Sequence, residues 1–239
     1  MSTPLAIITP TRRRWHWLAR QAAALAPQLS PDDRWIIAVD NDQPDERHTD
    51  RIRELVGDRL MIWAHFCYER PEPPVGVVNR LRNAAVAFAP PDAEIVEFDD
   101  HDIAAKDALA EIRHAFEVGN EFVFSWHHTD CLIEAPTGEL LLEPWPDYRP
   151  HYTAGGFARG DCQPCGIRAI KRELWNRLGG WSPDVWPEGN MHFCMRAESA
   201  RAKICCIEKP LCRVLIDPDG ISVRYRNLSV DHQARTHSM

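Results

Sequence analysis

Short apolar runs alternate with helix-like stretches through the first half of the chain, and this alternation limits the possible folds more than any other feature. The runs at 5–9, 35–39 and 94–98 have the length of strands, and after the first run apolar residues recur at helical spacing from Trp15 to Leu25. Strands that alternate with helices pair in parallel. The pattern therefore predicts an α/β fold with a Rossmann-type mixed, mostly parallel sheet flanked by helices.

The same patterns place the other elements. Strands are expected at 5–9, 35–39, 61–64, 94–98, 121–125 and 204–207, and helices at 15–25, 46–56, 78–88, 105–116, 170–178 and 191–199. The segment from 127 to 166 is rich in turns and strand-like, and we expect it to be a long excursion on the functional side of the sheet.

Composition restricts the class of protein. With 44% hydrophobic and 26% charged residues in 239 positions, the chain is globular, and it shows no repeat or linker, so we expect a single domain over 1–239. Its net charge of −7 excludes a surface that binds nucleic acid as a whole. It has no apolar run near the length of a membrane span and no features of a signal peptide at residues 1–4, which favours a cytoplasmic protein.

The eight cysteines are too dilute for a disulfide scaffold, and we expect most to be reduced thiols. Cys162 and Cys165 form the one C-x-x-C pair. A lone pair is weak evidence for a structural zinc site, so metal binding there stays open.

Three carboxylates crowd together where the strand at 94–98 ends, at Asp99, Asp100 and Asp102. Their mutual repulsion is costly unless a cation or strong hydrogen-bond donors compensate it. Hard oxygen ligands suit Mg²⁺ or Mn²⁺, which proteins hold with one or two carboxylates together with substrate phosphates. The alternative is an ordinary helix N-terminus, where acidic residues are also favoured.

Several short motifs in their order along the chain resemble family 2 glycosyltransferases with the GT-A fold. The resemblance covers about 5–225. The motifs that carry it are Ile7-Ile8-Thr9-Pro10-Thr11, Val39-Asp40-Asn41, Arg82-Asn83-Ala84-Ala85, Phe98-Asp99-Asp100-His101-Asp102, Gly166-Ile167-Arg168, Leu178-Gly179-Gly180-Trp181 and Arg196. It implies a nucleotide-sugar half at about 1–125, an acceptor half at about 126–225 and a C-terminal tail at 226–239.

The resemblance also implies roles for single residues in the nucleotide-sugar half. Asp100 and Asp102 match the D-x-D pair that holds Mn²⁺ or Mg²⁺, with Asp102 as the direct ligand and Asp100 on the ribose or a metal-bound water. The base, ribose and phosphates of the nucleotide would be held by Thr9, Thr11, Asp40, Arg82, Asn83, Asp99 and Asp100. For Asp40 a turn cap, and for Arg82 an ordinary solvated arginine, remain alternatives.

The chain departs from the family where an inverting enzyme needs a base. Counting back from Arg196, the expected Glu-Asp pair falls on Gly189-Asn190, and neither side chain can accept a proton at neutral pH. Glu188, Asp184 and His192 are the candidate catalytic residues nearby. Because a retaining enzyme or a binding protein could lack this base, the stereochemistry stays open.

The resemblance implies a metal-dependent glycosyltransferase whose donor is a nucleoside-diphosphate sugar, with UDP the first expectation and inversion the expected outcome. A nucleotide-sugar-binding protein that has lost transfer activity is the alternative. The acceptor is left open among a saccharide, a lipid, a protein side chain, a small metabolite and a modified nucleobase, and nothing indicates an oligomeric state. Aromatic side chains of the acceptor half could line its cleft or belong to the core, namely Trp126, Trp145, Trp181 and Trp186. Residues 12–14 form a basic run that is either a solvated helix start or a contact to an anion.

Overall fold

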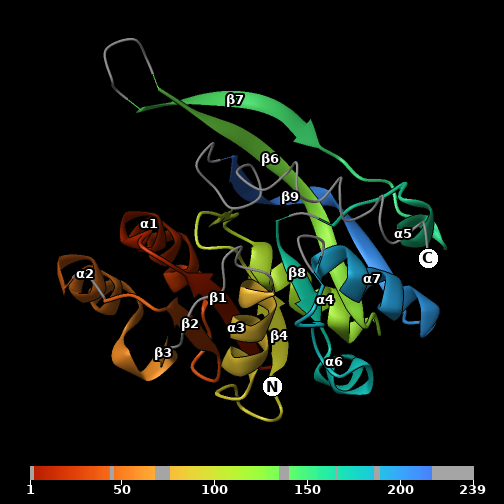
Figure 1. Ribbon diagram of the computed structural model, residues 1–239, viewed down its shortest axis with the longest axis horizontal. Coiled ribbons are helices and arrows are strands. Elements are labelled where there is room, and N and C mark those ends of the chain that lie inside the picture. The colour runs from red at the N-terminus through yellow and green to blue at the C-terminus, as the bar shows by residue number, and fades with distance from the viewer. Residues whose placement is uncertain are drawn as a thin grey trace.

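The described part of the chain forms one nine-stranded mixed sheet with helices on both faces (Figure 1). The structure is a computed structural model, and it describes residues 3–43, 46–67, 76–134, 140–164, 166–185 and 189–216. The strand order is β3-β2-β1-β4-β8-β6-β9-β5, with β7 paired to β6 outside this path. The predicted α/β fold and mixed sheet are confirmed.

The first half of the sheet is parallel. It contains β1 (Leu5–Thr11), β2 (Arg34–Asp40), β3 (Met61–Phe66) and β4 (Glu94–Glu97). Strand β1 lies between β2 and β4 and pairs in parallel with both. The carboxyl ends of these strands therefore meet at one edge of the sheet.

The second half of the sheet is mixed. Its strands are β5 (Ile103–Ala104), β6 (Phe122–Glu134), β7 (Leu140–Tyr148), β8 (Arg168–Ile170) and β9 (Ile204–Ile216). Strand β8 is antiparallel to both β4 and β6 and joins the two halves, whereas β6 and β9 are parallel. Strands β6 and β7 form a long antiparallel hairpin that extends beyond the body of the sheet (Figure 1).

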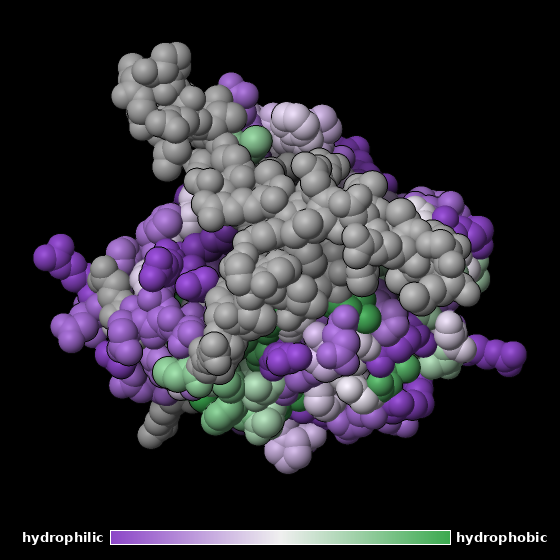
Figure 2. All heavy atoms as spheres, viewed as in Figure 1, coloured by the Kyte–Doolittle hydropathy of each residue, from purple (hydrophilic) through white to green (hydrophobic). Residues whose placement is uncertain are grey.

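Helices cover the sheet in two layers because alternate strand residues point to opposite faces. One apolar core packs α1 (Trp15–Leu25), α2 (Glu46–Val56) and α4 (Ala108–Glu117) on one face. The other core packs α3 (Val77–Val86), α5 (Gly156–Arg159), α6 (Arg172–Leu178) and α7 (Gly189–Ser199). Short 3-10 turns occupy 26–28 and 58–60. Away from these cores, the described surface around α1 and α2 is mainly hydrophilic (Figure 2).

Several element boundaries differ from the predictions in the second half. The helix predicted at 170–178 begins at Arg172, and Arg168–Ile170 is a strand. Three residues are too few to show a strand's alternation, and pairing with β4 and β6 on both sides decides the conformation. Strand β9 continues past the predicted end at 207, because register shifts carry the pairing with β6 through Pro210. The excursion at 127–166 holds the rest of β6 and all of β7.

No helix in the described ranges is both long and apolar enough to cross a bilayer. The single-domain assignment over 1–239 stays a prediction, and the predicted tail at 226–239 lies outside the described residues.

Candidate active site

Polar residues gather where β1, β2 and β4 end. Thr11 of β1 lies opposite Val39, so Asp40 lies one position further along the same edge, and both Thr11 and Asp40 are buried. The turns beyond the strands are tied together, because the backbone N–H of Arg13 donates to the Asp42 carboxylate at 2.9 Å. This edge is where open α/β sheets bind ligands.

Asp100 is held by donors from two segments. Its carboxylate accepts hydrogen bonds from the Thr11 hydroxyl at 2.9 Å and from the Arg14 guanidinium at 3.1 Å. The imidazole Nδ1 of His101 lies 3.1 Å from the same carboxylate. Burial opposes ionisation of Asp100, but the hydrogen bond from His101 and the charge of Arg14 outweigh it and lower the pKa. Asp100 is therefore an ionised carboxylate with a fixed orientation.

A second cluster pairs two acids with two arginines beneath Asp100. Glu97 is fully buried and receives a bidentate pair of hydrogen bonds from Arg168, each 2.8 Å long, and an ion pair from Arg82. Asp99 accepts a hydrogen bond from Arg82 at 3.0 Å and lies 3.7 Å from Arg168. Burial opposes its charge, yet the charges of Arg82 and Arg168 lower the pKa of Asp99 to about 2. The two negative charges of the acids are therefore matched by the two positive charges of the arginines.

Asp102 differs from its neighbours. It is 1% exposed, and neither carboxylate oxygen has a hydrogen-bond partner among the described residues. Burial raises the pKa of Asp102 to about 7, although the charge of His101 acts in the opposite direction. Burial also opposes the charge of His101, but the hydrogen bond to Asp100 and the charges of Asp102, Asp100 and Asp99 raise its pKa to about 9. An imidazolium 3.9 Å away is the cation nearest to Asp102 that the structure gives.

Because of these contacts, the electrostatic argument for a metal no longer applies equally to all three carboxylates. The sequence predicts that crowded carboxylates at Asp99, Asp100 and Asp102 need a cation or strong hydrogen-bond donors, and the chain itself supplies Arg14, His101 and the arginines of the Glu97 cluster. The charges of Asp99 and Asp100 are compensated in this way. The carboxylate left without sufficient compensation is that of Asp102.

Asp102 fits a divalent cation better than Asp100 does. Two buried carboxylate oxygens without donors are what a hard cation takes as a ligand, whereas the oxygens of Asp100 already accept hydrogen bonds. The described residues contain no group of three His, Cys, Asp or Glu side chains placed to hold a metal ion. A cation here would thus take one protein carboxylate and draw its other ligands from a bound phosphate, as Mg²⁺ often does.

Other predicted nucleotide contacts already have partners within the protein. The Thr9 hydroxyl is fully buried, accepts from the Trp35 indole at 3.0 Å and lies 3.4 Å from Gln21 Oε1. The Asn83 amide donates to the Trp181 carbonyl at 2.6 Å and accepts from the Trp181 N–H at 2.9 Å. Their roles in nucleotide binding stay predictions, and the contacts give both residues a part in holding the elements of the site together.

The structure shows what surrounds the position where the Glu-Asp pair is expected. Gly189 is buried, and a Cβ atom there would lie 2.0 Å from the Asn79 amide nitrogen, which donates to the carbonyls of Ser182 and Val185. A glutamate cannot enter without displacing Asn79. Asn190 does face the site, since its Oδ1 accepts from Arg82 at 3.0 Å.

The candidate bases lie in different surroundings. Asp184 has an 88% exposed side chain and lies 3.9 Å from Arg80. His192 lies on α7, and its Nδ1 is buried without a hydrogen-bond partner in the described part of the chain. Burial and then the charge of Arg196 lower the pKa of His192, so its imidazole is neutral. Glu188 lies outside the described residues.

Comparisons with known proteins concern the fold. No protein-family model and no curated protein matches the chain. Among solved structures, it is similar to TarS residues 1–349 from S. aureus in complex with UDP, with 13% identity and a TM-score of 0.66 over 90% of this chain and 61% of that one. A TarS complex with UDP-GlcNAc gives 13% identity and 0.66 over 92% and 60%.

A third similar structure is the mannosyltransferase PcManGT from Pyrobaculum calidifontis in complex with GDP-Man and Mn²⁺. It has 16% identity and a TM-score of 0.64 over 100% of this chain and 65% of that one. The chain has the GT-A fold. It spans about three-fifths of the length of these GT-A structures.

Within this cluster, sequence reasoning missed the residues that balance the charge of the acids. Arg14 belongs to a basic run that also fits a solvated helix start, but it binds Asp100. Glu97 is a charged residue in an otherwise apolar strand. Because a buried acid requires a cation, this residue could have indicated a buried arginine in the sequence. Arg168 lies in one of the motifs that carry the resemblance, and it is the partner of Glu97. The amide of Gln21 donates to the carbonyls of Asp99 and Asp102. Nothing in the sequence indicated this role.

The tryptophans of the acceptor half divide between core and surface. Trp181 is 1% exposed and belongs to the core, whereas Trp145 on β7 is 56% exposed. Trp126 lines a cavity on β6. Trp186, like Cys165 of the C-x-x-C pair, lies outside the described residues, and Cys162 is buried.

Proposed function

We propose that this chain transfers a hexosyl group from a nucleoside-diphosphate sugar to a hydroxyl acceptor, with Mn²⁺ or Mg²⁺ as the cofactor. The GT-A fold supports a glycosyltransferase, and the similar structures hold UDP, UDP-GlcNAc, and GDP-Man with Mn²⁺. UDP is our first expectation for the nucleotide, and inversion is our expectation for the stereochemistry.

The observation that carries this proposal is the buried, unpartnered carboxylate of Asp102 at the strand end. Leaving a carboxylate without hydrogen-bond donors costs free energy, and the charge of His101, 3.9 Å away, offsets only part of that cost. A ligand that brings a cation would repay it. Glu97, Asp99 and Asp100 already accept hydrogen bonds from within the protein. Asp102 is the carboxylate of this cluster for which the described residues supply none.

Each residue of the site then has a defined part. Asp102 would hold the metal ion, which supplies positive charge to the departing diphosphate. Thr11 and Arg14 orient the Asp100 carboxylate for hydrogen bonds to the ribose hydroxyls. Arg82 fixes Asp99 beside them. Asp40, buried at the end of β2, would accept from the base or ribose.

The candidate bases differ in how well they suit the role. The high exposure of Asp184 and its position beside Arg80 make it a solvent-facing residue. The Nδ1 of His192 has no hydrogen-bond partner among the described residues, but burial lowers the pKa of this histidine and weakens it as a base. Glu188 directly precedes α7 in the chain, and we retain it as the leading candidate, with His192 second.

A second function is supported by Gly189 and Asn190. These residues leave the expected base position without an acid, and Asn190 is occupied with Arg82. A protein that binds a nucleotide sugar without transferring it needs no base there. This candidate shares the donor site and differs only in turnover.

Calorimetry of UDP binding with and without Mn²⁺ tests the donor site. We expect Asp102→Asn to lower the affinity for UDP at least about tenfold in Mn²⁺, which corresponds to ~1.4 kcal/mol, and to leave binding in EDTA unchanged. Asp50→Asn, on the exposed face of α2, is the matched control and should behave as the wild type. Equal Mn²⁺ dependence in both variants would remove Asp102 from the site.

Turnover separates the two functions. If the protein is an enzyme, it should hydrolyse or transfer the sugar of UDP-GlcNAc, and Glu188→Gln should reduce the rate on the order of a hundredfold because general-base catalysis is lost. UDP binding should persist in that variant. The same slow turnover in both proteins would support the binding protein.

A further inference from the structure

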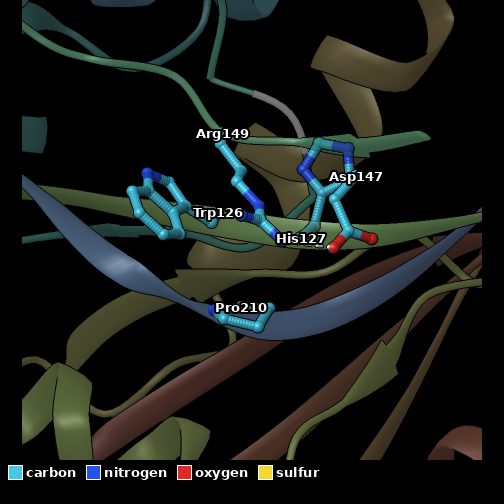
Figure 3. A pocket seen from close by; sticks show the side chains of 5 residues that line it. All are labelled: Trp126, His127, Asp147, Arg149 and Pro210. Atoms are coloured by element: carbon cyan, nitrogen blue, oxygen red, sulfur yellow. Dashed lines mark hydrogen bonds and ion pairs between the residues drawn. The ribbon is translucent and has the colours of Figure 1, made fainter.

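A cavity of about 150 Å³ lies between β6, the end of β7 and β9, away from the donor site described above. It is lined by Trp126, His127, Asp147, Arg149 and Pro210. Arg149 reaches down from the end of β7 between Trp126 and His127, Asp147 lies beside His127, and Pro210 lies on the β9 side (Figure 3). Its volume is comparable to that of a single pyranose ring.

An irregularity in the sheet makes the cavity possible. Trp126 and His127 are consecutive on β6 and would point to opposite faces of a regular strand. The register of β6 against β9 shifts on both sides of Trp126, and its register against β7 shifts after His127. Bulges of this kind re-aim side chains and are common beside binding sites. Both side chains can therefore line one cavity.

The cavity offers an apolar face and a polar rim. The Trp126 indole is held in place by a hydrogen bond to the Pro150 carbonyl at 3.1 Å, and the guanidinium carbon of Arg149 lies 5.7 Å from its ring centroid. Asp147 accepts hydrogen bonds from Arg149 at 3.1 Å and from His128 at 2.8 Å. The side chain of Arg149 is 64% exposed, so its remaining N–H groups can reach a ligand.

His127 adds an unused polar atom. The residue is 4% exposed, its ring lies 5.1 Å from that of Tyr148, and its Nδ1 has no hydrogen-bond partner among the described residues. Burial first, and then the charge of Arg168, lower the pKa of His127 to about 4. The imidazole is therefore neutral at pH 7. Asp147 and Arg149 cancel each other, so the cavity as a whole suits an uncharged ligand.

One side chain relates the cavity to the acidic cluster. Arg168 lies close enough to His127, which lines the cavity, to influence its ionisation, and it is 3.7 Å from Asp99. Arg168 is buried and held by Glu97, so its position is fixed.

From this geometry we propose that the cavity is the acceptor subsite and that it binds a pyranose ring of a neutral saccharide. The inference rests on the proposed glycosyltransferase function. A pyranose presents C–H groups on its faces and hydroxyls around its edge, which match the indole face and the polar rim. The paired carboxylate and guanidinium can bind neighbouring hydroxyls as acceptor and donor.

Saturation-transfer NMR with methyl glycosides of glucose, galactose, mannose and N-acetylglucosamine, in the presence of UDP and Mn²⁺, tests the proposal. We expect at least one glycoside to bind the wild type. Arg149→Ala should weaken its binding at least about fivefold, because it removes the exposed donor, and Trp126→Leu should do the same by removing the stacking face. Arg51→Ala is the matched control, since Arg51 is 60% exposed and also pairs with one carboxylate.

The outcomes separate this proposal from the proposed function. Thermal shifts with UDP and Mn²⁺ report the donor site independently of the cavity. If UDP binds and no glycoside does, or if the variants bind glycosides as well as the control, the saccharide subsite is refuted and the donor function stands. If glycosides bind and UDP does not, the donor function fails and the sugar site stands. A nucleoside that binds in place of the glycosides, and is lost in Arg149→Ala, would overturn the saccharide assignment.

Discussion

Glu97 and Asp102 lie on one short stretch of chain, and both are almost completely buried, but their surroundings are opposite. Glu97 has two arginines on its carboxylate, including a bidentate pair of 2.8 Å hydrogen bonds from Arg168. Asp102 has no hydrogen-bond partner in the described chain. The first carboxylate is part of the scaffold, and we propose that the second binds a ligand.

This difference shows that a cluster of acids need not act as one unit. Asp99 and Glu97 use their charge to fix Arg82 and Arg168, and Asp100 is held by Thr11 and its neighbours. The negative charges of these acids are therefore compensated by contacts within the protein. Asp102 is the acid of this cluster whose burial is not offset by hydrogen bonds from the described residues. A buried polar group without a partner therefore indicates a binding site better than the number of acids does.

Glu97→Gln should have the largest effect on stability. It leaves the two guanidinium groups of Arg82 and Arg168 buried with half of their counter-charge, and breaking a buried ion pair in this way costs about 3–5 kcal/mol. The free energy of unfolding in urea at pH 7 measures the loss. A change below about 1 kcal/mol would mean that Asp99 alone neutralises both arginines.

Asp102→Asn is the matched comparison in a neighbouring buried carboxylate. It breaks no hydrogen bond that the described residues make and removes a charge that burial disfavours, so unfolding should change by less than about 1 kcal/mol. Both variants replace a carboxylate by an amide, so the difference between them reflects the surroundings of the two residues. If Asp102→Asn proved the more destabilising of the two, our division between scaffold and ligand-binding acids would be wrong.

The contrast also shows what the sequence can predict. The parallel strands follow from short apolar runs, the helices α1, α3 and α4 follow from apolar periodicity, and the acidic cluster follows from its place after β4. Periodicity contains no information on which cation meets which acid. Arg168 reaches Glu97 because β8 inserts antiparallel beside β4, a pairing between segments far apart in sequence. The cavity depends on register shifts between β6 and β9, which no local pattern records.

Two adjacent histidines repeat the comparison of a partnered with an unpartnered group. His128 pairs with Asp147 at 2.8 Å and is half-exposed, whereas His127 is buried without a partner for Nδ1. Because the folded-state pKa of His127 is about 4, below the 6.5 of an unfolded histidine, the unfolded chain binds a proton first as the pH falls. Stability should therefore decrease from about pH 6.5 to pH 4.

His127→Gln should remove this part of the pH dependence. Relative to the wild type, the variant should gain on the order of 3 kcal/mol between pH 6.5 and pH 4, because about 2.5 pKa units of differential protonation disappear. The difference in unfolding free energy across that range isolates the residue from the carboxylates that titrate in both proteins. His128→Gln is the control. Parallel curves for wild type and His127→Gln would show that the buried imidazole accepts a proton without cost.

Asn190→Asp should have the smallest effect on stability and the most informative effect on activity. The Asn190 oxygen already accepts from Arg82 at 3.0 Å, so a carboxylate there keeps that contact, and the gain from its charge is opposed by nearby Asp99. We expect unfolding to change by less than about 1 kcal/mol. Turnover of UDP-GlcNAc should rise on the order of tenfold or more if the missing acid limits proton transfer.

Asn190→Ala provides the reference for that experiment, because it removes the contact to Arg82 without adding a base. A gain in Asn190→Asp alone would mean that the chain keeps a complete donor site and lacks one proton acceptor. Equal rates in both variants would mean that the proton leaves elsewhere, toward His192 or Glu188. Only the first outcome would show that an acid beside Arg82 limits the proposed transfer, whereas the second would show that the number of acids near Arg82 has no influence on it.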